Sequence, residues 1–313
     1  PGPVVRVCLA DGTRLMTTRP PDVTVDIDGR AIRLTNLDKV LYPSTGTTKA
    51  EVIDYYMKVA PAILPLLRDR PITRKRWPNG VGAKSFFEKN LPAGTPEWVP
   101  RVTLPHSGER SGRGARDLDY PLVHDVATLV WLAQGGALEL HAPQWRIDHQ
   151  SGRPAEPDRL VLDLDPGPPA GLDECCAVAV VARAMLGAHG FELHAVTSGS
   201  KGMQLYAPLP PTRERGREVL SRAGGPAEYA HAVARALERE MPDLVVSRMS
   251  RDLRTGRVLI DWSQNNPAKT TIVPWSLRGL EVPTAAMPVG WDEVESAGLV
   301  QRTLSSVLRQ LSP

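Results

Sequence analysis

The sequence has few cysteines, few aromatic residues and no long apolar run. Among its 313 residues are three cysteines, of which Cys175 and Cys176 are adjacent in an apolar, helix-like stretch, and no Cys/His spacing suits structural zinc. We infer a reducing, intracellular environment without a disulfide framework. No apolar run reaches membrane-spanning length and no signal peptide opens the chain, which predicts a cytoplasmic protein with no membrane partner.

The net charge is also small, because 38 Lys and Arg residues and 35 Asp and Glu residues leave only +3. Any surface for nucleic acid must therefore gather its positive charge locally. Hydrophobic residues make up 42% of the sequence and charged residues 23%, which excludes a disordered, collagen-like or coiled-coil chain. Aromatic residues make up only 5%, so a cluster of them is informative.

Strand-like and helix-like segments alternate along the chain, which predicts an α/β (α+β) fold. A capping box of Thr48 and Glu51 begins one helix, and apolar residues recur on one side of it. Further helices are predicted over Leu122–Ala133, from Asp173 to Gly190, and over Ala227–Glu240. Strands are predicted over Ala31–Leu34, Ala137–His141, Leu160–Leu164, Leu193–Thr197, Met203–Ala207 and Val258–Trp262.

Two stretches have little periodic pattern. Residues 1–28 are expected to form a partly ordered N-terminal extension that ends at a turn at Asp28–Gly29, and residues 29–313 to form one domain. The segment Ser107–Asp119 is rich in glycine, serine and arginine, and we expect it to be a mobile surface loop.

Two aspartates lie two residues apart near the end of a predicted strand. Because side chains two apart on a strand point the same way, Asp163 and Asp165 share one face while Leu162 and Leu164 enter the opposite, buried side. Like charges this close raise each other's pKa unless a cation neutralises them, and magnesium or manganese prefers such oxygen ligands. The alternative is a strand end whose acids cap the following turn.

A third acid, Asp261, ends another apolar strand. A third carboxylate on a neighbouring strand would complete a site for two metal ions about 3.5–4 Å apart, the arrangement used for in-line phosphoryl or nucleotidyl transfer. The alternative is an edge-strand acid that faces water.

The turn Thr197–Gly202 is rich in small residues and contains Lys201. Its glycines let backbone N–H groups approach an anion closely, and the lysine adds a point charge. The turn lacks the spacing and the following helix of a Walker A loop, so a generic glycine turn is the alternative.

Basic residues are concentrated in one segment that contains Arg70, Arg74, Lys75 and Arg76. Such a run is often a solvated face. Two adjacent phenylalanines, Phe86 and Phe87, follow shortly after and cannot both face the core from a regular strand. We therefore expect an exposed ring beside a basic patch, which is a platform for stacking bases.

Two lysines surround the start of the capped helix. Lys49 lies in its first turn, where free backbone N–H groups and the helix dipole favour an anion, and Lys39 could join it across the loop of residues 42–46. The alternative is that both lysines face solvent.

Eight sequence blocks occur in a recognisable order. They are Leu37–Pro43, Arg74–Gly80, Phe86–Lys89, His141–Trp145, Leu162–Gly167, Thr197–Gly202, Asp261–Asn265 and Ser276–Gly279. From Ile32 to Trp291 this series resembles the polymerase domain of bacterial ligase D, a branch of the archaeo-eukaryotic primase superfamily.

The resemblance implies a primase-polymerase fold, in which an RRM-like catalytic sheet packs on a second α/β layer. It implies template-dependent nucleotidyl transfer that fills gaps and extends ends in bacterial non-homologous end joining, with ribonucleotides favoured and two Mn²⁺ or Mg²⁺ ions as cofactors. Its partners would be DNA gaps or ends with a 5′-phosphate, nucleoside triphosphates (NTP or dNTP), a Ku-like end binder and a DNA ligase, and its location would be the nucleoid.

The resemblance also implies roles by position. The catalytic residues and metal ligands would be Asp163, Asp165 and Asp261. The incoming nucleotide and its triphosphate would be held by Lys75, His141, Ser198, Lys201, Gln264 and Arg278, with Arg254 near the metal site. DNA would be bound by Lys39, Lys49, Arg74, Arg76, Phe86 and Phe87, the rings stacking on template bases and the lysines holding the 5′-phosphate.

One residue departs from this pattern, because Gln204 stands where many relatives have histidine, and an amide cannot carry charge. No ligase or nuclease motif follows Trp291, so a domain of a larger ligase and a stand-alone primase-polymerase are both open. Two other functions are alternatives. A non-catalytic DNA-end-binding module needs the basic and aromatic surface but not the acids, and a two-metal phosphodiesterase needs no triphosphate site.

Overall fold

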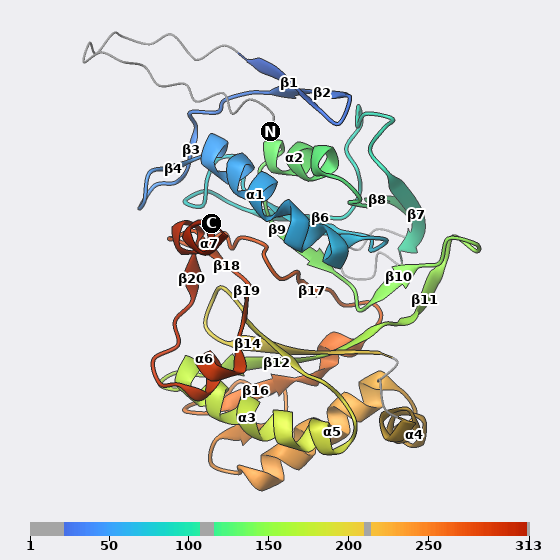
Figure 1. The fold of residues 1–313 in the computed structure, drawn as a ribbon, viewed down its shortest axis with the longest axis vertical. Coiled ribbons are helices and arrows are strands. Elements are labelled where there is room, and N and C mark those ends of the chain that lie inside the picture. Colours follow the sequence, from blue (N-terminus) through green and yellow to red (C-terminus); the bar gives the residue numbers. More distant parts are fainter. Residues whose placement is uncertain (1–21, 107–115, 210–213, 312–313) are drawn as a thin grey trace.

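Two β-sheets lie face to face, and helices cover the outer face of each (Figure 1). The computed structural model describes residues 22–106, 116–209 and 214–311, so most of the predicted extension and of the predicted loop lies outside the described residues. In the first half of the chain the elements are β1 (Val23–Ile27), β2 (Arg30–Leu34), β3 (Val40–Tyr42), β4 (Thr47–Thr48), α1 (Lys49–Leu67), β5 (Thr73–Arg76), β6 (Phe86–Glu88), β7 (Arg101–His106), β8 (Arg116–Pro121), α2 (Val126–Gln134), β9 (Ala137–Ala142), β10 (Trp145–Ile147) and β11 (Pro154–Pro157).

The second half of the chain builds the larger sheet. Its elements are β12 (Arg159–Pro166), α3 (Leu172–Ala188), β13 (His194–Thr197), β14 (Met203–Pro208), α4 (Glu214–Ala223), α5 (Pro226–Glu240), β15 (Val245–Val246), β16 (Val258–Asp261), the short 3-10 helix η2 (Trp262–Asn265), β17 (Thr271–Ile272), β18 (Thr284–Ala285), β19 (Met287–Val289), α6 (Trp291–Glu295), β20 (Arg302–Thr303) and α7 (Leu304–Leu311). No described helix is both long and apolar enough to cross a membrane.

The larger sheet has six strands in the order β15-β16-β12-β14-β13-β19. Within it, the succession β12-α3-β13-β14-α5-β16 gives the spatial order β16-β12-β14-β13, with all neighbours antiparallel. This is the order of an RRM-like sheet, so the predicted fold class is confirmed. Leu160, Leu162 and Leu164 of β12 belong to the apolar core beneath α3 and α5, as strand alternation requires.

The smaller sheet has the order β17-β9-β5-β6 and is covered by α1 and α2 (Figure 1). The inner faces of the two sheets meet through a small apolar cluster that includes Val161 of β12, Tyr206 of β14 and Ile272 of β17. Polar residues next to this cluster therefore lie between the two sheets.

Several local predictions are confirmed. Thr48 and Glu51 form both hydrogen bonds of a capping box at the start of α1. Asp28 and Gly29 have φ of 54° and 76° and form the turn of the β1–β2 hairpin, although strand β1 was not predicted.

Three local predictions need correction. Helix α2 begins at Val126 and not at Leu122, because the Asp125 side chain caps it by accepting a hydrogen bond from the Thr128 N–H. The predicted loop over residues 107–119 ends in β8, which pairs with β7 and buries Leu118. Strand β16 ends at Asp261, since the Asp261 carboxylate accepts from the Ser263 N–H and starts a 3-10 turn.

Candidate functional site

Three acids lie on the inner face of the larger sheet. Strands β12 and β16 pair antiparallel with Asp163 directly opposite Asp261, and Asp165 lies two residues further along β12. Directly opposite residues on an antiparallel pair point to the same face, so the three carboxylates share it. The structure thus brings Asp261 beside the Asp163/Asp165 pair, from 98 residues away in the sequence.

The electrostatics of Asp163 reflect this crowding. Burial raises its pKa, the charges of Asp261 and Asp165 raise it further, and together they outweigh a hydrogen bond from Gln204 and the charge of Arg278. The resulting pKa is about 7, well above the ordinary 3.8. A cation bound between these carboxylates would relieve the repulsion.

The other two acids have protein partners. Asp165 Oδ2 lies 3.4 Å from Arg254 Nη1, while Asp261 accepts from the Ser263 N–H and from Gln264 Nε2 at 2.8 Å. Within the described residues, no three His, Cys, Asp or Glu side chains converge as a ready metal site. Three carboxylates on one face of the sheet still fit a hard divalent cation by their chemistry.

A cleft of about 270 Å³ opens beside these acids. The predicted residues that line it are His141, Asp163, Asp165, Ser198, Lys201, Gln264 and Arg278. Lys75, Arg254 and Asp261 are not among its lining residues. The structure therefore gathers five of the seven predicted nucleotide contacts around one cavity, with residues from both sheets.

The Thr197–Gly202 turn reaches the cleft because Gly202 packs on β12. A Cβ built on Gly202 would lie 1.9 Å from the Leu164 carbonyl oxygen, so no other residue allows this approach. Gly199 has a φ of 70°, and its N–H donates to Gln301 Oε1 at 2.7 Å. The close packing places Ser198 and Lys201 in the wall of the same cleft as Asp163 and Asp165.

Gln204 lies opposite Asp163 on β14 and is buried. The Tyr206 hydroxyl donates to Gln204 Oε1 at 2.8 Å, which turns the amide so that its NH₂ group donates to Asp163. Gln204 therefore touches the acid itself. Sequence reasoning identified the unusual residue but not this contact, which depends on the register of β12 and β14.

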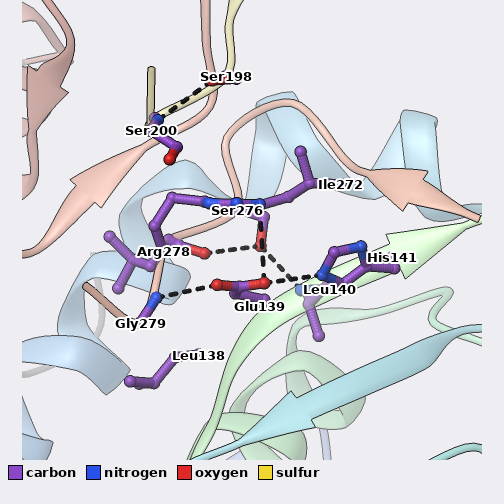
Figure 2. A network of polar contacts seen from close by, with 12 residues as sticks. Leu138, Glu139, Leu140, His141, Ser198, Ser200, Ile272, Ser276, Arg278 and Gly279 are labelled. Atoms are coloured by element: carbon purple, nitrogen blue, oxygen red, sulfur yellow. Dashed lines mark hydrogen bonds and ion pairs between the residues drawn. The ribbon is translucent and has the colours of Figure 1, made fainter. Parts of the chain in front are cut away.

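A fourth acid near the cleft, Glu139, was missed by sequence reasoning. Its side chain is only 3% exposed and faces His141, Arg278 and the Gly279 N–H (Figure 2). Burial raises its pKa, but the hydrogen bond from His141 and the charges of Arg278, His141 and Lys75 outweigh burial and lower it to about 2. The available signal was one charged residue within the apolar strand Ala137–His141.

Phe86 and Phe87 lie on opposite faces of edge strand β6, so they do not form one platform. Both are exposed, by 43% and 61% respectively. The Phe87 ring meets His141 edge-on at 5.6 Å and Lys75 Nζ at 5.4 Å, on the side of the cleft. The Phe86 ring instead contacts the Arg76 guanidinium at 5.4 Å.

The side chains of the basic run are more buried than those of a solvated face would be. Arg74 is 2% exposed, and its guanidinium donates to the Asn90 carbonyl and pairs with Glu88. Arg74 therefore leaves the set of proposed DNA contacts, because its buried guanidinium is already paired with an acid. Arg76 is partly exposed but also bonds to Glu88 and to the Gly135 carbonyl.

The two lysines near α1 are neighbours. Lys39 Nζ donates to the Pro78 carbonyl at 2.6 Å, and Lys49 Nζ donates to the Thr35 carbonyl at 2.9 Å. Lys49 is only 7% exposed, which contradicts the alternative that both lysines face solvent. Burial, together with the charges of Lys39 and Arg76, lowers the pKa of Lys49 to about 8.

Comparisons with known proteins agree with this arrangement. The LigD primase-polymerase domain family matches residues 48–313. The chain is 46% identical over 281 residues to a multifunctional non-homologous end joining protein LigD of Mycolicibacterium smegmatis, covering 90% of this chain and 34% of that protein. It is 32% identical over 268 residues to the bifunctional LigD of Bacillus subtilis, covering 85% of this chain and 40% of that one.

A solved structure is also similar. The polymerase domain from Mycobacterium tuberculosis ligase D, in complex with DNA, superposes with a TM-score of 0.79 at 45% identity, over 90% of this chain and 94% of that chain. The curated relatives are longer, and this chain spans 34% to 40% of the two named above.

Proposed function

Because the chain belongs to the family of LigD primase-polymerase domains, we propose that it fills gaps and extends DNA ends in bacterial non-homologous end joining. Domains of this family are DNA-directed, metal-dependent nucleotidyltransferases. The observation that supports the proposal most is the pairing of Asp163 with Asp261 beside a cleft that contains Lys201 and Arg278. The proposed place of action is the cytoplasm, at the nucleoid.

The three acids are the proposed metal ligands, for two Mg²⁺ or Mn²⁺ ions. Such ions lower the pKa of a primer 3′-hydroxyl and stabilise the charge that develops on the leaving pyrophosphate. Asp163 is held by Gln204, while Asp165 and Asp261 are held by partners that they can exchange for a cation. The chain's own part in the reaction is to place these oxygens on one sheet face.

The remaining cleft residues, together with Lys75 beside the cleft, are the proposed triphosphate and nucleotide contacts. Lys201 and Arg278 supply positive charge to the triphosphate, while Ser198, Gln264, His141 and Lys75 orient the nucleotide. Two buried guanidinium nitrogens, Nε of Arg254 and Nε of Arg278, have no hydrogen-bond partner in the part of the chain that the structure describes. A buried donor without a partner is costly, and Arg278, which lines the cleft, is the one of the two that an anionic ligand there would reach. A preference for ribonucleotides is part of the proposal.

DNA is the proposed macromolecular partner, with a template strand near Phe87 and the 5′-phosphate of a gap near Lys39 and Lys49. The relatives are much longer than this chain and are named as non-homologous end joining proteins. We therefore propose that the chain acts together with a Ku-like end binder and a DNA ligase. An arrangement as a stand-alone primase-polymerase is compatible with the same site.

A labelled primer–template incubated with Mn²⁺ and nucleoside triphosphates tests the function. Elongation of the primer is expected, with NTP used in preference to dNTP. An unchanged primer would favour the non-catalytic end-binding module, and a shortened primer would favour a phosphodiesterase.

Recognition of the 5′-phosphate is expected to depend on pH through Lys49. Below about pH 8 Lys49 is charged in the folded protein, so gapped DNA with a downstream 5′-phosphate should bind more tightly than the unphosphorylated gap. The difference should shrink as the pH rises through 8, and it should also fade at high salt. Fluorescence anisotropy with both gaps measures it.

Lys49→Ala should remove most of this discrimination. Lys58→Ala is the matched control, because Lys58 is an exposed lysine of the same helix that pairs with Asp54. Equal affinity of the wild type for the two gaps at low salt would refute the phosphate site.

The two phenylalanines are expected to contribute unequally. Phe87→Ala should weaken binding of a primer–template with a single-stranded template by about fivefold to a hundredfold, because a stacked base contributes about 1–3 kcal/mol. Phe86→Ala should have a smaller effect, since its ring lies on the other face of β6 against Arg76. Equal losses in the two variants would contradict the assignment of the cleft-side ring.

A further inference from the structure

Glu139 is a buried acid in the wall of the cleft that accepts hydrogen bonds at both of its oxygens. Oε1 accepts from the Gly279 N–H at 3.1 Å, and Oε2 lies 2.9 Å from His141 Nε2 (Figure 2). Arg278 Nη1 is 3.6 Å from the same Oε2. One carboxylate thus joins strand β9 to a segment 140 residues further along the chain.

This geometry determines the tautomer of His141. With a backbone N–H on one oxygen and a guanidinium beside the other, Glu139 is an ionised acceptor, so His141 Nε2 must be the donor. Burial, and the charges of Arg278 and Lys75, lower the pKa of His141, although Glu139 opposes them. A neutral imidazole with its proton on Nε2 leaves a lone pair on Nδ1. In Figure 2 the second ring nitrogen points away from Glu139.

We propose that Glu139 is a positioning residue, which fixes His141 as the neutral Nε2–H tautomer and aligns the Arg278–Gly279 segment with β9. The consequence for nucleotide binding rests on the proposed function, whereas the tautomer does not. An Nδ1 lone pair accepts hydrogen bonds, and triphosphate oxygens also only accept. His141 therefore contacts a donor group of the nucleotide, on the sugar or the base, and does not hold the triphosphate.

The surrounding contacts allow Glu139 to be changed without unfolding the site. The Tyr56 hydroxyl donates to the Leu138 carbonyl at 2.6 Å and accepts from the Leu277 N–H, and Ser276 Oγ accepts from the Leu140 N–H at 2.8 Å. These bonds connect the same two segments independently of Glu139. Glu139→Gln keeps the shape of the side chain and an acceptor for Gly279.

The tautomer is tested first, by the ¹⁵N signals of His141 in the protein without nucleotide or metal at about pH 7. The wild type should show a protonated Nε2 and an unprotonated Nδ1, and Glu139→Gln should lose this pattern because its amide NH₂ group cannot accept from Nε2. An imidazolium or an Nδ1–H tautomer in the wild type would overturn the proposal, whether or not the variant folds. The exposed Glu192→Gln is the matched control and should leave the signals unchanged.

Kinetics and binding test the consequence. Glu139→Gln and His141→Ala should each raise the KM for the nucleotide by up to about tenfold, with a smaller change in kcat, as the loss of one neutral hydrogen bond to the nucleotide implies. The double variant should be no worse than His141→Ala, and multiplied effects would overturn the coupling. Binding of inorganic tripolyphosphate should change less than twofold in His141→Ala, and a large loss would place His141 on the triphosphate instead. A wild type that fails to extend primers would refute only the proposed polymerase function, since the nitrogen signals do not depend on it.

Discussion

Asp163→Asn is expected to reduce primer extension by about a thousandfold or more while leaving the fold intact. Asp163 lies opposite Asp261 and next to Asp165, and cation binding at such a site supplies several kcal/mol of transition-state stabilisation. Asparagine keeps the size of the side chain but removes the charge that a divalent ion needs. The measurement is single-turnover extension with Mn²⁺ or Mg²⁺ at saturating nucleotide, and extension within tenfold of the wild type would contradict the assignment.

The same variant is expected to be more stable than the wild type when metal is chelated. The folded-state pKa of Asp163, about 7, exceeds its ordinary 3.8, so ionisation of this group opposes folding. The opposition is absent below about pH 4, grows as the pH rises, and is complete above about pH 7. In thermal unfolding with EDTA, the melting temperature of Asp163→Asn should therefore be higher than that of the wild type at pH 8 and equal to it near pH 4.

The control for that experiment is an exposed acid, Asp243→Asn. It should not change the pH dependence of stability. Mn²⁺ should raise the melting temperature of the wild type but not that of Asp163→Asn, because only a ligand that binds the folded site shifts the unfolding equilibrium.

Gly202→Ala is expected to have the second largest effect, on both stability and nucleotide binding. The added Cβ would meet the Leu164 carbonyl oxygen and, at 2.8 Å, Pro166 Cδ, so the turn must move away from β12. Overpacking of this kind costs about 1–3 kcal/mol, and the displaced turn carries Lys201 away from the acids. Thermal unfolding and the KM for the nucleotide measure the two losses.

Gly187→Ala is the matched control, because a Cβ there meets nothing within 4 Å and the residue lies within α3. Removing a glycine from a helix should raise stability by about 0.5–1 kcal/mol and leave the KM unchanged. Similar losses in both variants would show that the close approach of the turn to β12 is not what the glycine provides.

Local patterns predicted those features that depend on a single segment. Strand alternation predicted that Asp163 and Asp165 share a face opposite Leu162 and Leu164, and the structure has that arrangement. The capping box of α1 follows from residues three apart. Such patterns depend on φ, ψ and side-chain spacing within a few residues.

Features that depend on pairing between distant segments could not be predicted from local sequence patterns. The register that places Asp261 opposite Asp163 cannot be derived from either strand alone, although Asp261 was a candidate third carboxylate on a neighbouring strand. The same holds for Glu139, whose partner Gly279 comes from a distant loop. Arg74 was predicted to contact DNA, but it is buried where its strand pairs with Glu88.

The most direct measurement is the anomalous scattering of Mn²⁺ in crystals of the protein with a nucleoside triphosphate. We expect manganese bound between Asp163, Asp165 and Asp261, with Asp165 and Asp261 released from Arg254 and Gln264 and the triphosphate beside Lys201 and Arg278. Manganese bound elsewhere, or a triphosphate-occupied cleft in which Asp261 touches no ion, would contradict the central claim that these acids form one catalytic centre.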